Sequence, residues 1–251
     1  MTNLRPPRIL VIAGSDSSGG AGIQADIKTI TMLSGYAMTA ITALTAQNTR
    51  GVRAVEACDP DFVAAQMDAC MEDIGVDAVK IGMLGSADIA EVVADRLEDL
   101  PCPIVFDPVM VATSGSVLAD AATIEVFEWL MELATLTTPN VPELEALGGA
   151  SAMAERGVAY LAKGGDADGP MVEDRLVRPG VEDVVWSEAR IVTKHTHGTG
   201  CTLSSAIATH LAHGLLLEEA VSKARRFVRE ALMHAPGFGL GNGPLGHQAV
   251  R

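Results

Sequence analysis

Residues 9–22 of the chain, ILVIAGSDSSGGAG, join a run of apolar residues to a glycine-rich segment. The apolar run from Ile9 to Ala13 has the length and composition of a buried strand. A helical pattern follows from about Ala21 to Ser34, so the glycines lie at a strand-to-helix junction. Glycines there let a ligand approach the backbone, and the helix N-terminus offers unpaired N–H groups. The segment is neither a P-loop nor a clean dinucleotide fingerprint, and by itself a plain tight turn explains it equally well.

The alternation of strand and helix continues outward from this junction. Short apolar runs predict further strands at residues 38–45, 78–81, 103–106 and 158–162. Helical spacing predicts helices over about 59–75, from 87, around 124–131, at 199–214 and at 218–234. Residues 171–193 are typical of antiparallel strands with turns. Near-continuous apolar strands between helices indicate an α/β fold whose mostly parallel sheet is covered on both faces. Because no linker or internal repeat is visible, we expect one domain over residues 1–251.

The helix over 59–75 has defined ends. Asp59 is the predicted N-cap, Pro60 occupies the first helical position, and Gly75 lies just past the end. Four apolar side chains fall on one helical face and are predicted to point inward: Val63, Met67, Cys70 and Ile74.

Composition limits the classes of partner. The 251 residues are 48% hydrophobic and 20% charged, as in ordinary globular proteins. A formal net charge of −14 argues against a nucleic-acid partner, because neutralising phosphates requires clustered Lys and Arg. The apolar run near the N-terminus is too short for a secretory signal or a membrane span. The four cysteines show neither a C-x-x-C pair nor metal-ligand spacing, so we expect a reduced, cytoplasmic protein with no membrane partner.

A second glycine-rich segment, residues 196–202 (THGTGCT), opens the helix that starts at Thr199. Backbone amides of residues 198–201 at a helix N-terminus can form an anion cradle. Cys201 would sit in the first turn, where the helix dipole favours its thiolate. A proton acceptor beside an anion cradle suits phosphoryl transfer, in which positioning and charge stabilisation supply most of the catalysis. The alternative is a helix cap with a buried structural cysteine.

Three smaller features follow other predicted strands. Asp107 stands where a carboxylate would lie at the carboxyl end of its strand, the edge at which open α/β sheets bind ligands. Asn140 and Glu143 are spaced to reach a metal-bound phosphate from one helix face, although an N-cap followed by a first-turn acid explains them as well. Lys163 follows another apolar run. Their recurrence after successive strands suggests that they share one crevice.

Taken together, these segments resemble the hydroxymethylpyrimidine/phosphomethylpyrimidine kinases of thiamin biosynthesis, in the ribokinase-like superfamily. The matching stretches run in order along almost the whole chain, at residues 13–26, 41–49, 80–84, 107–110, 138–143, 163–165 and 196–202. The resemblance implies an αβα sandwich that is usually dimeric. It implies phosphorylation of 4-amino-5-hydroxymethyl-2-methylpyrimidine, and then of its monophosphate to the pyrophosphate, with ATP and Mg²⁺ in both steps.

The resemblance also implies roles for individual residues. Gln47 would recognise the amino and ring-nitrogen edge of the pyrimidine, which agrees with its own chemistry because a carboxamide offers both a donor and an acceptor. Cys201 would accept the hydroxymethyl proton, which requires a thiol pKa near neutral. The remaining pocket residues would be Gly14, Asp26 and Met83, and Asp26 could equally be a solvated surface acid. The anion cradle would be Gly198, Thr199 and Gly200. The nucleotide side would use Asn140, Lys163 and Thr196, and the metal side Asp107 and Glu143.

Three departures and three alternatives stand beside this interpretation. Ser17 replaces a frequent proline, Asp166 replaces a common histidine, and residues 148–160 look short for a helix-plus-strand unit. A pyridoxal or pyridoxine kinase on the same scaffold would also phosphorylate a hydroxymethyl group on a heteroaromatic ring. A non-catalytic pyrimidine-binding regulatory protein would bind the ligand without turnover. A hydrolase using Cys201 with His195 or His197 would leave both glycine-rich junctions unexplained.

Overall fold

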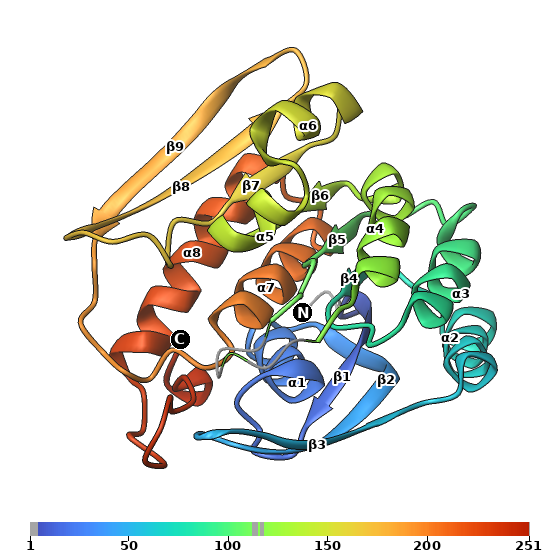
Figure 1. Ribbon diagram of the computed structural model, residues 1–251, viewed down its shortest axis with the longest axis horizontal. Coiled ribbons are helices and arrows are strands. Elements are labelled where there is room, and N and C mark those ends of the chain that lie inside the picture. The colour runs from blue at the N-terminus through green and yellow to red at the C-terminus, as the bar shows by residue number, and fades with distance from the viewer. Residues whose placement is uncertain (1–4, 112–114, 116–117, 251) are drawn as a thin grey trace.

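The computed structural model describes residues 5–111, 115 and 118–250. Within them, nine strands form one sheet in the order β3-β2-β1-β4-β5-β6-β7-β8-β9 (Figure 1). The strands are β1 (Arg8–Asp16), β2 (Tyr36–Asn48), β3 (Gly51–Ala57), β4 (Ala78–Ile81), β5 (Ile104–Phe106), β6 (Leu136–Thr137), β7 (Tyr160–Ala162), β8 (Met171–Arg178) and β9 (Val181–Ala189). The six central strands, β2, β1, β4, β5, β6 and β7 in sheet order, pair in parallel, whereas β3, β8 and β9 are antiparallel additions at the two edges. This confirms the predicted mostly parallel sheet.

Helices cover both faces of the sheet, as Figure 1 shows. They are α1 (Gly22–Met32), α2 (Pro60–Asp73), α3 (Ala87–Leu97), α4 (Ala121–Leu133), α5 (Val141–Ala146), α6 (Gly149–Arg156), α7 (Thr199–Ala212) and α8 (Leu217–Met233), followed by the short 3-10 helix η1 (His247–Ala249). Alternate residues of β1 supply the two cores, because successive side chains of a strand point to opposite faces. Leu10 and Ile12 pack with α2, α3 and α4, and Ile9 and Val11 pack with α1, α7 and α8.

The helix α2 begins as its sequence predicts. The Asp59 carboxylate accepts hydrogen bonds from the backbone N–H groups of Asp61 and Phe62, and Pro60 is the first helical residue. Val63 and Met67 are fully buried. The prediction that Ile74 points inward is wrong, because this residue is the C-cap of α2 and is 37% exposed.

Several short elements were absent from the predicted pattern. The strand β6 has only two residues, and most residues of β3 are exposed, so neither carries a clear hydrophobic period. Residues 149–156 form the two-turn helix α6, which precedes the three-residue strand β7. Within the described part of the chain, no helix combines the length and apolar character needed to span a bilayer.

Candidate active site

A cavity of about 890 Å³ opens at the carboxyl ends of the parallel strands. Its lining comes from the junction after β1, the end of β2, the segments after β4, β5 and β7, and the N-terminal turn of α7. The predicted site residues that line it are Gly14, Gln47, Met83, Asp107, Asn140, Glu143, Lys163, Thr196, Gly198, Thr199, Gly200 and Cys201. The sheet therefore collects residues that are scattered along the sequence, because parallel strands place their carboxyl ends at one edge.

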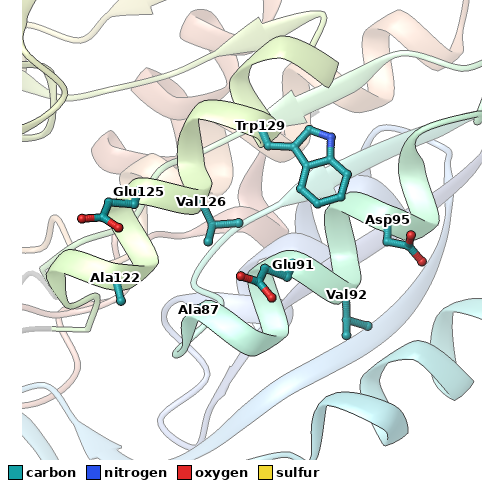
Figure 2. Close-up of a pocket in the computed structure, with 8 residues that line it drawn as sticks. All are labelled: Ala87, Glu91, Val92, Asp95, Ala122, Glu125, Val126 and Trp129. Atoms are coloured by element: carbon teal, nitrogen blue, oxygen red, sulfur yellow. The ribbon is translucent and has the colours of Figure 1, made fainter.

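A second hollow of about 570 Å³ lies between α3 and α4. Figure 2 shows it bordered by Glu91 and Asp95 of α3 and by Glu125, Val126 and Trp129 of α4. None of the predicted site residues lines this groove, and its charged lining residues are all acidic. The larger cavity is therefore the candidate active site.

The two glycine-rich segments meet in the cavity wall. Gly198 has a φ of +89°, and a Cβ at this position would overlap the carbonyl oxygen of Gly20. A Cβ on Gly20 would in turn overlap the ring of His197. Both glycines are therefore required by close approach of the two segments, and the first segment is more than a plain tight turn.

Asp16 organises the first glycine-rich segment, although it is not among the predicted site residues. Its carboxylate accepts hydrogen bonds from the backbone N–H groups of Ser18 (2.8 Å), Gly20 (3.0 Å) and Ala21 (2.9 Å), and it lies 2.8 Å from His197 Nε2. Burial acts to raise the pKa of Asp16, but these hydrogen bonds outweigh it and hold the pKa at about 2. The signal was present in the sequence, since an aspartate followed by glycines just before a helix is typical of a side chain that binds nearby backbone N–H groups.

Asp107, Lys163 and Glu143 form a charged group beside the N-terminal turn of α7. Lys163 Nζ lies 2.7 Å from Asp107 Oδ1 and 3.8 Å from Glu143 Oε2. Burial acts to raise the pKa of Asp107, but Lys163 and Lys80 outweigh it, so the pKa is lowered. Burial raises the pKa of Glu143 to about 7, with Lys163 opposing the shift and Asp107 adding to it. At neutral pH Glu143 can therefore gain or lose a proton.

Asn140 and Glu143 also form the capping box of α5. Asn140 Oδ1 accepts the Glu143 backbone N–H at 2.9 Å, and Glu143 Oε2 accepts the Asn140 backbone N–H at 2.8 Å. The structural explanation of this pair is thus correct. It does not exclude the functional one, because the capping bonds engage only Asn140 Oδ1 and Glu143 Oε2, and both residues line the cavity.

Cys201 lies in the first turn of α7, as predicted, and is half-buried. The expected direction of its pKa shift is wrong. Burial raises the pKa of the Cys201 thiol to about 11, and the carboxylates of Asp26 and Asp107 add to the shift while Lys80 opposes it. Desolvation and the two neighbouring acids thus outweigh Lys80 and the backbone hydrogen bond of Gly22, both of which lower the pKa.

Asp26 is neither a surface acid nor part of the cavity lining. It is fully buried on α1, where Lys80 Nζ lies 3.1 and 3.0 Å from its two oxygens and Ser205 Oγ donates to it at 2.7 Å. Burial acts to lower the pKa of Lys80, but Asp26, Cys201 and Asp107 outweigh it and raise the pKa. Lys80 lines the cavity and was missed as a site residue, although a lysine inside a short buried strand is itself a signal.

The cavity extends towards β8, β9 and α8. Its lining there includes Asp166, Asp174 and the apolar side chains of Val172, Ile191, Val228 and Leu232. Arg225 Nε donates to Asp174 Oδ2 at 2.7 Å, and Asp174 Oδ1 accepts the Gly164 backbone N–H at 2.9 Å. Asp174 thereby connects α8 to the Lys-Gly-Gly segment.

Comparison with known proteins gives a consistent family. A family model described as phosphomethylpyrimidine kinase matches residues 16–246. The chain is 44% identical to the hydroxymethylpyrimidine/phosphomethylpyrimidine kinase of Synechococcus elongatus, over 96% of this chain and 97% of that protein. It is also 44% identical to the thiamine biosynthesis bifunctional protein of Geobacter sulfurreducens, over 95% of this chain and 52% of that protein. The chain therefore spans about half the length of this second relative.

Solved structures agree with the fold. The chain resembles an ADP complex of Bacillus subtilis pyridoxal kinase with a TM-score of 0.87 and 33% identity, over 98% of this chain and 99% of that one. It resembles the phosphomethylpyrimidine kinase of Clostridium difficile with a TM-score of 0.76 and 39% identity, over 90% of this chain and 99% of that one. These likenesses confirm the ribokinase-like αβα sandwich. Since the family model spans most of the chain and the sequence relatives agree with it, the chain belongs to the phosphomethylpyrimidine kinase family.

Proposed function

We propose that the chain transfers the γ-phosphoryl group of ATP to the hydroxymethyl oxygen of 4-amino-5-hydroxymethyl-2-methylpyrimidine. A second transfer to the resulting monophosphate would give the pyrophosphate, for thiamine biosynthesis. The main support for the proposal is that Gln47 and the glycine-rich turn of α7 line the same cavity. The carboxamide of Gln47 suits an aminopyrimidine edge, and the chain belongs to this family.

The pyrimidine would bind beside the end of β2. Gln47 can donate to the ring nitrogen and accept from the exocyclic amino group. Gly14 and Met83 would form the wall next to it, and a Cβ on Gly14 would overlap the Met83 methyl group. The absence of a side chain at Gly14 therefore leaves Met83 free to pack against a flat ring.

The phosphoryl group would lie against the N-terminal turn of α7. Its N-cap residue Gly198 has no side chain to occupy the first turn, so the backbone N–H groups of Gly198 and Gly200 can face an anion. The predicted third donor, the Thr199 N–H, instead donates to the Thr196 carbonyl oxygen at 3.3 Å. Lys163 supplies a positive charge at the same place, because its Nζ and the Asp107 Oδ2 each lie 3.4 Å from the position that a Cβ on Gly200 would take. Both elements stabilise charge that develops on the transferred group.

Cys201 is the proposed acceptor of the hydroxymethyl proton. A thiol pKa of about 11 leaves a small thiolate fraction at pH 7. Phosphoryl transfer through a loose transition state needs little help from a base until the new P–O bond is largely formed. Cys201 would therefore accept the proton late, and only its thiolate form could do so.

The acidic residues of the cavity fit a magnesium–phosphate complex. Among the described residues no three potential metal-ligating side chains gather into a cluster. Magnesium, however, usually binds one or two carboxylates together with waters and substrate phosphates. Among the hydrogen bonds between described residues, Asp107 Oδ2 takes part only in a 3.4 Å contact with Ser204 Oγ, so it has capacity for such a ligand. Glu143 lies on the other side of Lys163, whose Nζ is 3.8 Å from Glu143 Oε2. Bound there, Mg²⁺ would neutralise phosphate charge. Asn140 and Thr196 would contact the nucleotide from the same wall.

We also propose that the protein is cytoplasmic and forms a homodimer. The four cysteines are all free thiols, in keeping with a reducing compartment. Tyr36, Leu44 and Val55 on β2 and β3 are large hydrophobic residues that are about half exposed, and contact with a second copy at this edge of the sheet would bury apolar surface. Light scattering of the purified chain would measure the mass of the assembly, and a monomeric mass would contradict the dimer.

The test of function is ATP-dependent phosphorylation of hydroxymethylpyrimidine, its monophosphate and pyridoxal, side by side with Mg²⁺. Turnover of both pyrimidines with weak pyridoxal activity is the expected result. A preference for pyridoxal would instead identify the protein as a pyridoxal kinase, like its solved neighbour from Bacillus subtilis. Binding of the pyrimidine without turnover would favour the regulatory alternative.

A further inference from the structure

His197 lies where three segments of the cavity wall meet. Its Nε2 is 2.8 Å from Asp16 Oδ2, in the first glycine-rich segment, and 3.5 Å from the carboxamide nitrogen of Gln47, at the end of β2. Its backbone N–H donates to the carbonyl of Gly243 at 3.1 Å. The side chains of His197 and Asp16 are both almost completely buried, so the imidazole is held in one place.

Asp16 decides which nitrogen of His197 carries a hydrogen. The carboxylate already accepts three backbone N–H groups and remains ionised near neutral pH, since its pKa is about 2. An ionised carboxylate can only accept hydrogen bonds. His197 Nε2, 2.8 Å away, must therefore be an N–H donor.

This hydrogen, together with Thr45, decides the orientation of Gln47. Thr45 Oγ1 lies 3.0 Å from the Ser15 carbonyl oxygen and 3.1 Å from Gln47 Oε1, while Gln47 Nε2 faces His197 Nε2. In that arrangement an N–H of Gln47 points at the N–H of His197. The hydroxyl hydrogen of Thr45 would also have to bond both the Ser15 carbonyl oxygen and Gln47 Oε1. A carboxamide turned by 180° keeps its shape, so its hydrogen-bond partners determine its orientation.

Turning the Gln47 carboxamide removes both of these conflicts. The Thr45 hydroxyl then donates to the Ser15 carbonyl, which can only accept. Gln47 donates an N–H to Thr45 Oγ1, and its oxygen, 3.5 Å from His197 Nε2, becomes a second acceptor of the N–H that His197 donates to Asp16. The remaining N–H and the second lone pair of the Gln47 oxygen are left for a ligand, in a fixed order along the cavity wall.

We propose that His197 is a specificity-determining positioning residue, which holds the Gln47 carboxamide with its oxygen on the His197 side and its nitrogen on the Thr45 side. The identity of the ligand rests on the proposed function. An aminopyrimidine would place its exocyclic amino group against the Gln47 oxygen and its ring nitrogen against the Gln47 N–H. Pyridoxal has no exocyclic amino group, so it would leave the second lone pair of the fixed Gln47 oxygen without a donor from the ligand, a mismatch that discriminates between ligands.

The experiment compares two substitutions of His197. His197→Leu removes the donor with little change of volume, and His197→Gln returns an N–H close to the position of Nε2. In His197→Leu we expect KM for hydroxymethylpyrimidine to rise about tenfold, the cost of one lost hydrogen bond, with a smaller change in kcat and in KM for pyridoxal. His197→Gln should recover most of the loss, and thermal melting checks that each variant is folded.

A double-mutant cycle tests whether His197 acts through Gln47. In a Gln47→Ala background, His197→Leu should raise KM for the pyrimidine only slightly further, because the side chain that it positions is gone. Fully additive effects, or equal losses for the pyrimidine and pyridoxal, would overturn the positioning role while leaving the proposed function intact.

Two readouts are independent of turnover. Long-range ¹H–¹⁵N correlations of the His197 ring in the wild-type protein should show a hydrogen on Nε2, and a neutral ring protonated on Nδ1 would overturn the inference. If the wild type phosphorylates no pyrimidine, the proposed function fails, and calorimetry then decides the role of His197. Weaker binding of hydroxymethylpyrimidine to His197→Leu would support it, whereas equal binding or no binding to either protein would refute it.

Discussion

Gly198→Ala is the substitution that most directly tests the contact between the two glycine-rich segments. Gly198 has a φ of +89°, a left-handed conformation that costs a residue with a side chain about 1–2 kcal/mol. The new Cβ would also overlap the backbone carbonyl oxygen of Gly20, which cannot rotate away as a flexible side chain could. Overpacking of this kind costs about 1–3 kcal/mol. We therefore expect a total loss of about 2–5 kcal/mol in the free energy of unfolding.

Gly180→Ala is the matched control. Gly180 has a φ of +71° in the exposed turn between β8 and β9, and a Cβ there would meet no atom within 4 Å. In this variant only the left-handed backbone conformation lowers the free energy of unfolding, by about 1–2 kcal/mol. The difference between the two variants thus isolates the contact between Gly198 and Gly20.

Urea unfolding followed by circular dichroism measures both losses. Gly198→Ala should also lower kcat/KM, because it moves the anion-binding turn of α7, whereas Gly180→Ala should leave kcat/KM unchanged. Equal destabilisation by the two substitutions would refute the close approach. So would a Gly198→Ala protein with full activity.

Three further predictions concern ionisable groups. If the Cys201 thiolate is the base, kcat should rise about tenfold per pH unit from pH 7 to 9, because the thiol pKa is about 11, and a flat profile would contradict the base role. The raised pKa of Glu143, about 7, means that its contribution to stability is present below pH 4.5 and is lost as the pH rises through 7. Urea unfolding of Glu143→Gln at pH 5 and pH 8 should therefore show a smaller loss between the two pH values than the wild type, and parallel losses would exclude Glu143 as the source. Lys80→Met should destabilise the protein by about 3–5 kcal/mol in the same assay, since it leaves the buried Asp26 carboxylate unpaired, and adding Asp26→Asn should recover part of that loss. A Lys80→Met protein as stable as the wild type would show that the ion pair contributes nothing net.

Local sequence patterns predicted the elements that have strong periodicity or clear end signals. The strand β4 (Ala78–Ile81) has the predicted bounds, and α2 begins at Pro60 behind its Asp59 cap. These features depend on neighbours a few residues away, which a sequence shows directly. The strand β3 was not predicted because it is mostly exposed at a sheet edge, and β6 was not predicted because it has only two residues.

The residues of the candidate site could be predicted from the sequence, but the ion pairs and hydrogen bonds between them could not. Asp107, Lys163 and Cys201 each follow a strand or begin a helix at the ligand-binding edge, so a general rule of α/β sheets brings them together. The same rule says nothing about which side chains pair. Lys163 bonds to Asp107, but Lys80 turns to Asp26 inside the protein.

The sequence by itself determined the α/β fold, the edge of the sheet at which the site lies and the family to which the chain belongs. Only the tertiary structure decided that Asp16 holds His197, that Asp26 is buried with Lys80, and that the pKa of Cys201 is raised rather than lowered. The physical reason is that strands and helices form from local spacing, whereas ionisation depends on desolvation and on charges brought from other parts of the chain.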